Sequence, residues 1–331
     1  MPSSTISAFI AVLALLSSEQ QTPDCIGLVT ASGGDQFWRE VEAGASAAAA
    51  EVELKLEVRS SFDDKDIAQQ RVVIDELQTM ACSTIVMAPN SPERAQDVAK
   101  LKQQGIRTIF IDRDFPAERA TAILTDNYAT GERAAIAMAA ELPPGSAVGL
   151  LRLHKQVSST SEREQGFIDG AQVAGLTVVL DDYIDTPQSD ADSGATTAQQ
   201  AAQLIASVPQ LAGLFTPNES TTTAAVLARQ SLAQPSTIVH IGVDSNKLLL
   251  KSLAQQELHS LFLQRPFLIG YQGVMAASKL QQGHALPDVI LTEATYITTV
   301  DLQQPEIQAL LRESDSRASS NNEPVEKPLT D

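Results

Sequence analysis

The sequence predicts an α/β protein built from two open parallel sheets, each covered by helices on both faces. The chain has 331 residues, which is too long for one ordinary hydrophobic core and suits two domains. Apolar strand segments alternate with helical segments, as crossovers between parallel strands require. The alternation stops near Asp126 and then begins again, which indicates the same architecture twice.

Short apolar runs and helical spacing give the elements of the first half. Strands are predicted over residues 25–30, 54–60, 84–89 and 108–112. Helices are predicted over residues 37–52, 66–80 and 93–105, the last of them closed by Gly105.

The second half repeats this pattern. Strands are predicted over residues 146–153, 176–182, 212–216, 237–244, 259–264 and 294–299, and helices over 128–142, 161–175, 190–207, 219–233 and 267–283. The tail from about Glu313 is polar and poor in aromatic residues, so we expect residues 313–331 to be disordered.

Composition and motifs exclude several classes of function. The chain carries 41 acidic against 23 basic residues, a formal charge of -18, which disfavours nucleic acid as a partner. The four histidines are scattered and paired-ligand spacing is absent, so no metal is expected. G-x-G-x-x-G and G-x-S-x-G are absent too. We therefore expect no cofactor and no enzymatic activity.

The N-terminus carries an apolar run from Ile6 to Leu16. Eleven residues are too few to cross a bilayer, but they match the apolar segment of a secretory leader, which we place over residues 1–23. Two features fit poorly, because the first basic residue is Arg39 and no clean cleavage site follows the run. An ordinary N-terminal helix is the alternative.

The two cysteines are Cys25, which opens the first predicted strand, and Cys82, which lies just before the strand at 84–89. If those strands are neighbours, both sulfurs lie at the same end of the sheet, which permits a disulfide. Two buried free thiols are an equally good interpretation.

Polar side chains follow several predicted strands at the point where each strand ends. They are Asp35, Asp112, Arg113, Asn218, Asp244 and Gln264, with Phe37 and Trp38 in the first strand-to-helix loop and Arg163 near a helix start. Ligands of open parallel sheets bind outside the carboxyl ends of the strands. Carboxylates accept hydrogen bonds from hydroxyls, and guanidinium groups donate in a planar fork. The set therefore predicts a site for a small polyhydroxy ligand.

Each candidate also has a purely structural interpretation. Asp112 and Arg113 would suit an interdomain salt bridge, and Asn218 would suit a helix N-cap. Phe37 and Trp38 are adjacent, so we expect that they do not both face the same core and that one stays near the loop surface, where an aromatic ring can stack on a sugar.

Arg163 lies in "SSTSEREQGF", where Ser159 with Glu162, or Ser161 with Glu164, matches a capping box. A helix that starts there places the Arg163 cation in its first turn, at a cost of roughly 0.3–1 kcal/mol against the helix dipole. This unfavourable placement favours a second role for Arg163 in binding.

Taken together, these motifs resemble the ribose-binding protein family, the periplasmic sugar-binding components of ABC importers. The resemblance rests on "IGLVTASGGDQFW", "IDRD" with "LTDN", "SEREQGF", "LFTPNES", "HIGVDS" and "LFLQRPFLIG", and covers about residues 24–312. It implies the type I periplasmic binding protein fold, in which two Rossmann-like domains are joined by a three-strand hinge. It also implies an N-terminal lobe of residues 24–125 plus 265–291 and a C-terminal lobe of residues 126–264 plus 292–312.

By position, the resemblance implies ligand contacts from Asp35, Phe37, Trp38, Asp112, Arg113, Arg163, Thr186, Asn218, Asp244 and Gln264. Three positions depart from the ribose-binding pattern. Thr186 stands where those proteins place a second stacking aromatic, Ala31 replaces a hydroxyl, and Asp35 falls where they carry an amide. The pocket is therefore expected to be wider on one side, and ribose itself is not the expected ligand. The three aspartates set against Arg113 and Arg163 favour a neutral polyol or hexose over a phosphorylated ligand.

The function implied is that of an exported monomer that captures a monosaccharide or related polyol and delivers it to an ABC permease. An exported sensor module that presents its closed form to a membrane receptor is one alternative. A repressor-type effector domain is less expected, because such a domain follows a basic DNA-reading helix pair and no Lys or Arg precedes Cys25.

Overall fold

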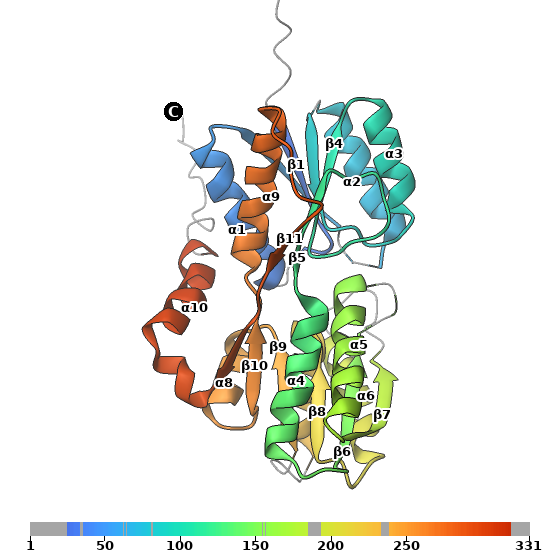
Figure 1. Cartoon of the computed structure of the whole chain (residues 1–331), viewed down its shortest axis with the longest axis vertical. Helices are drawn as coiled ribbons and strands as arrows, with labels where there is room; N and C mark the ends of the chain where they lie inside the picture. Colours follow the sequence, from blue (N-terminus) through green and yellow to red (C-terminus); the bar gives the residue numbers. More distant parts are fainter. Residues whose placement is uncertain are drawn as a thin grey trace, which may run out of the picture.

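Two six-stranded sheets form the framework of the molecule, one in each of two lobes (Figure 1). The computed structural model describes residues 25–33, 36–61, 63, 65–80, 82–153, 155, 157–184, 193–232 and 238–318. Within this part of the chain every strand pair is parallel except β10 with β12. The predicted fold class is confirmed.

The first sheet has the strand order β11-β5-β4-β3-β1-β2. Its strands are β1 (Cys25–Thr30), β2 (Lys55–Ser60), β3 (Thr84–Met87), β4 (Arg107–Ile111), β5 (Thr121–Thr125) and β11 (Val289–Thr292). The helices of this lobe are α1 (Gln36–Glu51), α2 (Ile67–Thr79), α3 (Arg94–Gln103) and α9 (Pro266–Gln281).

The second sheet has the strand order β12-β10-β9-β8-β6-β7. Its strands are β6 (Ala147–Arg152), β7 (Thr177–Tyr183), β8 (Gly213–Thr216), β9 (Val239–Val243), β10 (Ser260–Leu263) and β12 (Thr295–Thr298). The helices are α4 (Asn127–Glu141), α5 (Ser158–Val173), α6 (Ser193–Ala206), α7 (Glu219–Ser231) and α8 (Lys247–Ala254), followed by the 3₁₀ helix η1 (Thr299–Gln303) and helix α10 (Pro305–Ala318).

The chain passes between the two sheets three times. The first passage runs from β5 to α4, the second from β10 to α9, and the third from β11 to β12. These passages are the three connections of the hinge. The residue numbers at which the sequence divides the lobes stay a prediction.

Several elements were not predicted from the sequence. Strands β5 and β11 and helix α8 were missed, because their apolar runs are short and adjoin polar loops. The expected tail also begins too early, since α10 continues to Ala318, five residues beyond Glu313. The apolar residues Ile307, Leu310 and Leu311 of α10 precede the expected tail and pack against the core of the second lobe. Residues 1–24 and 319–331 lie outside the described residues.

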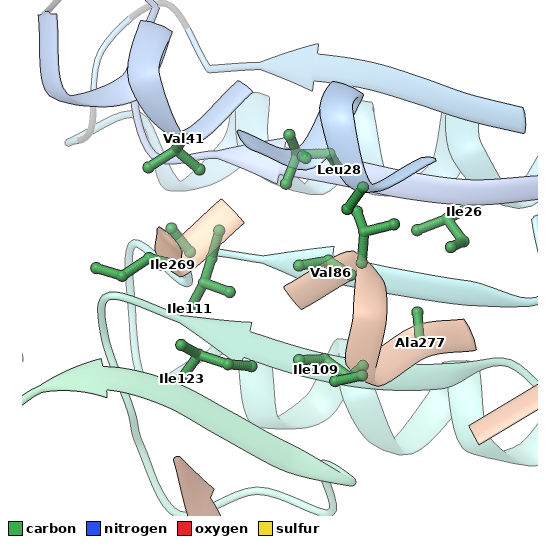
Figure 2. Packing of buried hydrophobic residues seen from close by; sticks show 14 of the residues in the cluster. Ile26, Leu28, Val41, Val86, Ile109, Ile111, Ile123, Ile269 and Ala277 are labelled. Atoms are coloured by element: carbon green, nitrogen blue, oxygen red, sulfur yellow. The ribbon is translucent and has the colours of Figure 1, made fainter. Parts of the chain in front are cut away.

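The core of the first lobe shows why its strands are so apolar. All six residues of β1 are buried, because helices cover both faces of the sheet. On one face Leu28, Val86 and Ile109 form one cluster with Val41 of α1 and Ile269 of α9 (Figure 2).

Two helix pairs pack so closely that glycine is required where they touch. A Cβ atom at Gly131 of α4 would lie 1.9 Å from the carbonyl oxygen of Arg163 in α5. In the other lobe, a Cβ atom at Gly44 of α1 would lie 1.9 Å from the carbonyl oxygen of Phe267 in α9. Since real side-chain atoms cannot approach a backbone so closely, these glycines set the distance between the helices.

Cys25 and Cys82 form a disulfide that joins the start of β1 to the segment before β3. Of the two interpretations left open by the sequence, the bridged one is found. Disulfides persist in oxidising compartments, so the bridge fits a protein that works outside the cytoplasm.

None of the helices in the described ranges is both long enough and apolar enough to span a membrane.

Candidate functional site

The two sheets present an aspartate in the same way at the ends of equivalent strands. Asp112 follows β4 with a φ of +63°, and Asp244 follows β9 with a φ of +71°. The backbone N–H of Asp112 donates to Ile123, and that of Asp244 donates to Phe262, each at 2.9 Å. Left-handed backbone is unusual for residues other than glycine and is concentrated at functional sites. Both strands therefore end in a turn that directs a carboxylate away from the sheet.

Asp112 lies in a buried charged cluster that includes groups of both lobes. Arg113 Nε is 3.3 Å from Asp112 Oδ2, and the Arg113 guanidinium lies 5.9 Å from the centre of the Trp38 ring. Burial raises the pKa of Asp112, and the charges of Arg113 and Arg163 and a hydrogen bond from Ser159 act against this rise. Ser159 and Arg163 belong to α5 of the second lobe. The ion pair of Asp112 and Arg113 in the first lobe is therefore part of a larger contact between the lobes.

Arg163 is buried and donates three hydrogen bonds to the chain. Its Nε donates to Asn127 Oδ1 at 2.8 Å, its Nη1 to the carbonyl oxygen of Pro217 at 2.8 Å, and its Nη2 to Gln264 Oε1 at 2.5 Å. Burial lowers the pKa of Arg163, whereas the carboxylates Asp244 and Asp112 raise it. Arg163 thus joins segments that lie far apart in the sequence.

The expected surroundings of Arg163 were partly wrong. Helix α5 begins at Ser158 with Val157 as its N-cap and without a side-chain cap, so neither predicted capping box is present. Arg163 therefore lies in the second turn rather than the first. The helix dipole therefore imposes no such cost on Arg163, and its hydrogen bonds explain its position instead.

Gln264 connects the passages between the lobes to Asp244. Its Oε1 accepts from Thr125 Oγ1 at 2.8 Å as well as from Arg163, and its Nε2 donates to Asp244 Oδ1 at 2.7 Å. The second carboxylate oxygen of Asp244 accepts from the backbone N–H of Glu219 at 3.0 Å. Burial raises the pKa of Asp244, and the charge of Arg163 opposes the rise.

Asn218 takes the capping role that the sequence allowed. Its Oδ1 accepts from the backbone N–H of Thr221 at 3.1 Å, and its own backbone N–H donates to Thr221 Oγ1 at 3.3 Å, which completes a capping box at the start of α7. Its Nδ2 donates to Ser220 Oγ at 2.9 Å. A ligand contact from Asn218 stays a prediction.

The two aromatic side chains of α1 reach the same core, contrary to expectation, but one of them, Phe37, stays partly at the surface as expected. Trp38 is buried in the core cluster of the first lobe, and half-buried Phe37 packs against the same cluster. Their rings meet edge to face with centres 4.9 Å apart. Both residues lie in the first turn of α1, and their side chains reach the same cluster although they leave the helix in different directions.

A pocket lies among residues of both lobes. Its polar lining residues are Glu40, Glu219, Asp244, Ser245, Gln264 and Arg265. Its apolar lining residues are Phe37, Leu263, Pro266, Phe267, Leu268, Leu310 and Leu311. The space among them, including the part open to solvent, is about 470 Å³. Three predicted ligand contacts, Phe37, Asp244 and Gln264, thus line one pocket.

Asp35 and Thr186 lie outside the described residues, so their contacts stay predictions. In the part of the chain that the structure describes, no cluster of three or more His, Cys, Asp or Glu side chains could hold a metal ion.

The model of the periplasmic binding protein domain family matches residues 26–285, which is most of the chain. The chain belongs to this family.

Relatives of this periplasmic binding protein include two ribose import binding proteins. That of Haemophilus influenzae is 25% identical over 270 residues, 81% of this chain and 89% of the relative. That of Bacillus subtilis is 28% identical over 236 residues, 70% of each chain. The resemblance inferred from the motifs is confirmed.

Solved structures agree in fold. The periplasmic component of an ABC-type sugar transport system from Hahella chejuensis has a TM-score of 0.77 at 30% identity, over 82% of this chain and 99% of that one. An ABC transporter solute-binding protein from Agrobacterium vitis, solved with α-D-tagatopyranose, has a TM-score of 0.79 at 26% identity, over 86% and 98%.

Sequence reasoning missed several residues of this periplasmic binding protein's site. Asn127 and Thr125 hold Arg163 and Gln264, and Leu310 and Leu311 line the pocket. Both Thr125 and Asn127 belong to the motif "LTDN", where polar residues at the end of a short apolar run were the available signal. No local signal in the sequence places α10 beside the pocket.

Proposed function

We propose that this periplasmic binding protein captures a monosaccharide or related polyol between its lobes, outside the cytoplasm, and delivers it to an ABC import permease. The arrangement of Asp112 and Asp244 carries the proposal. Each ends a strand of a different sheet in left-handed backbone, and both lie within electrostatic reach of Arg163. Carboxylates and guanidinium groups between two lobes suit a ligand that offers hydroxyls on several sides.

Such a site can supply the required affinity without any catalytic group. Three or four charge-assisted hydrogen bonds at roughly 1.5–3 kcal/mol each sum to about 5–12 kcal/mol before the cost of closure. A micromolar complex requires about 8 kcal/mol. Only closed lobes bring both aspartates to one ligand, so binding favours the closed state.

The comparisons support a sugar as ligand. Two relatives are named as ribose import binding proteins, and one structural neighbour holds a tagatopyranose. The proposed contacts are the ten predicted ones, Asp35 and Thr186 included. The proposed lobes are residues 24–125 plus 265–291 and 126–264 plus 292–312. We further propose that the protein acts as a monomer, without cofactor or catalysis.

The disulfide supports export. Thiols of cytosolic proteins are kept reduced, whereas a bridge such as Cys25–Cys82 persists in the periplasm. Fractionation of cells that produce the full chain tests this directly. Recovery of the bridged protein in the periplasmic fraction is expected, and recovery in the cytosol alone would contradict export.

A thermal-shift screen against pentoses, hexoses and polyols tests the proposed ligand class. A ligand that binds only the folded state raises the melting temperature. At a ligand concentration one hundred times Kd, the free energy of unfolding rises by about 2.7 kcal/mol. We expect at least one neutral sugar to do so. No shift from any sugar or polyol would contradict the proposal. For a sugar that binds, uptake by vesicles holding the cognate permease then tests delivery.

Sugar affinity is expected to fall on mild acidification. Burial raises the pKa of Asp112 and Asp244 above their ordinary value of 3.8, so both protonate at higher pH than an exposed aspartate. Protonation removes the charged acceptors, and affinity is lost as the pH falls through the raised values. Calorimetric titration of the bound sugar from pH 7.5 downwards measures this loss.

The fold itself supplies the control for this measurement. The pKa of each carboxyl group is higher in the folded state than in the unfolded state. These two groups therefore stabilise the fold most below pH 3.8, and their contribution falls as the pH rises from 3.8 to the raised pKa. Circular dichroism should therefore show an intact fold where affinity has already dropped. If the sugar affinity stays constant as the pH falls to the ordinary aspartate pKa of 3.8, binding does not require either carboxylate to be ionised.

A further inference from the structure

Helix α10 contacts both lobes. Ile307 is buried in a core cluster of the second lobe, and Leu310 and Leu311 pack against that cluster. The helix also contacts α1 of the first lobe. Figure 1 shows α10 at the left of the molecule, beside both lobes. The helix follows the last passage of the hinge, so it lies at the junction that must change when the lobes move.

The same helix forms part of the pocket wall. Leu310 and Leu311 line the pocket together with Phe37, Asp244 and Gln264, three of the predicted ligand contacts. Helix α10 starts at Pro305, beyond residues 26–285 that the family model matches. This wall is therefore contributed by a part of the chain outside the common family domain.

The wall and the strand ends differ in chemistry. Among the side chains that the structure describes, α10 contributes Leu310 and Leu311 to the pocket, whereas Asp244 and Gln264 contribute a carboxylate and an amide. A ligand hydroxyl can form hydrogen bonds with those strand-end groups. A hydroxyl held against the two leucines exchanges its hydrogen bonds with water for apolar contacts, which is unfavourable.

We propose that Leu310 and Leu311 determine ligand specificity and select a sugar that presents a carbon without a hydroxyl to α10, such as a 6-deoxyhexose. This inference rests on the proposed function and narrows its ligand class. The polar strand ends recognise the hydroxylated ring, and α10 packs on the methyl group. Adding one hydroxyl at that carbon is expected to weaken binding by about tenfold to a hundredfold.

Matched sugar pairs test the wall on the full chain. Isothermal titration compares D-galactose with 6-deoxy-D-galactose, and D-glucose with 6-deoxy-D-glucose. We expect the deoxy member of at least one pair to bind at least tenfold more tightly. In the double variant Leu310→Ala with Leu311→Ala the ratio is expected to fall below threefold, because the wall no longer contacts the methyl group.

Two further variants keep the test decisive. Ile307→Val changes the same helix in a residue that does not line the pocket, so it should keep the wild-type ratio. Leu311→Gln supplies an amide for the added hydroxyl and should favour the hydroxylated sugar, even if the double variant fails to fold.

The inference is overturned if both members of each pair bind equally, if neither member of either pair binds, or if the ratio survives loss of both leucines. The thermal-shift screen separates this failure from that of the proposed function. A shift with any other sugar or polyol leaves the proposed function standing and removes only the role of α10.

Discussion

Replacing Arg163 by alanine is expected to abolish sugar binding and to lower the free energy of unfolding by about 3–5 kcal/mol. The substitution removes the donor from Asn127, from the carbonyl oxygen of Pro217 and from Gln264, all in a buried network. It also removes the cation that offsets the burial of Asp244 and one of the two cations that act on Asp112.

Urea unfolding and calorimetric sugar titration measure the two effects. Arg133→Ala is the matched control, since Arg133 is exposed and donates to the carbonyl oxygen of Ala294. Its cost is expected to stay within about 1 kcal/mol, with affinity retained. Wild-type affinity in Arg163→Ala would show that this guanidinium serves the fold alone.

Replacing Gly131 by alanine is expected to cost about 3 kcal/mol of stability and to weaken sugar binding. The new Cβ atom would lie 1.9 Å from the carbonyl oxygen of Arg163 and 2.7 Å from the backbone nitrogen of Phe167. Backbone atoms cannot rotate aside as a side chain can, so α4 and α5 must separate. This places the cost at the upper end of the usual range for overpacking. The displaced segment carries Arg163, so its hydrogen bonds are disturbed.

Gly33→Ala provides the comparison. A Cβ atom there would meet its nearest neighbour, Ser60 Cβ, at 3.4 Å, an ordinary contact. Its effect on the melting temperature should be small. If Gly131→Ala melts and binds like wild type, the close packing of the two helices does not position Arg163.

The alternation of strands and helices was readable because each element carries its own signal. Residues 25–30 are mostly apolar and form a strand buried on both faces. Asp112, Asp244 and Gln264 directly follow strands, as the sequence predicted. Each of the three lies at the carboxyl end of its strand, which is where ligands bind in open parallel sheets.

Other features lacked a local signal. Ile307, Leu310 and Leu311 have helical spacing, but the apolar segment is short and its flanking residues are polar. The sequence therefore did not predict a helix that packs on a lobe. The N-terminal limit of α5 was misjudged because Ser and Glu residues imitate a cap that the chain does not use. In each case a tertiary contact outweighed the local pattern.

The sequence by itself determined the two-sheet architecture, the strand ends that carry polar groups, and the kinds of chemistry those groups offer. These depend on periodicity and residue type over a few neighbouring positions. Only the tertiary structure decided which groups meet. Arg163 reaches Gln264 across 101 positions of the sequence, Cys25 reaches Cys82 across 57, and α10 borders the pocket. Such contacts depend on how whole helices and sheets pack. No short stretch of sequence determines which residues so far apart in the chain will meet.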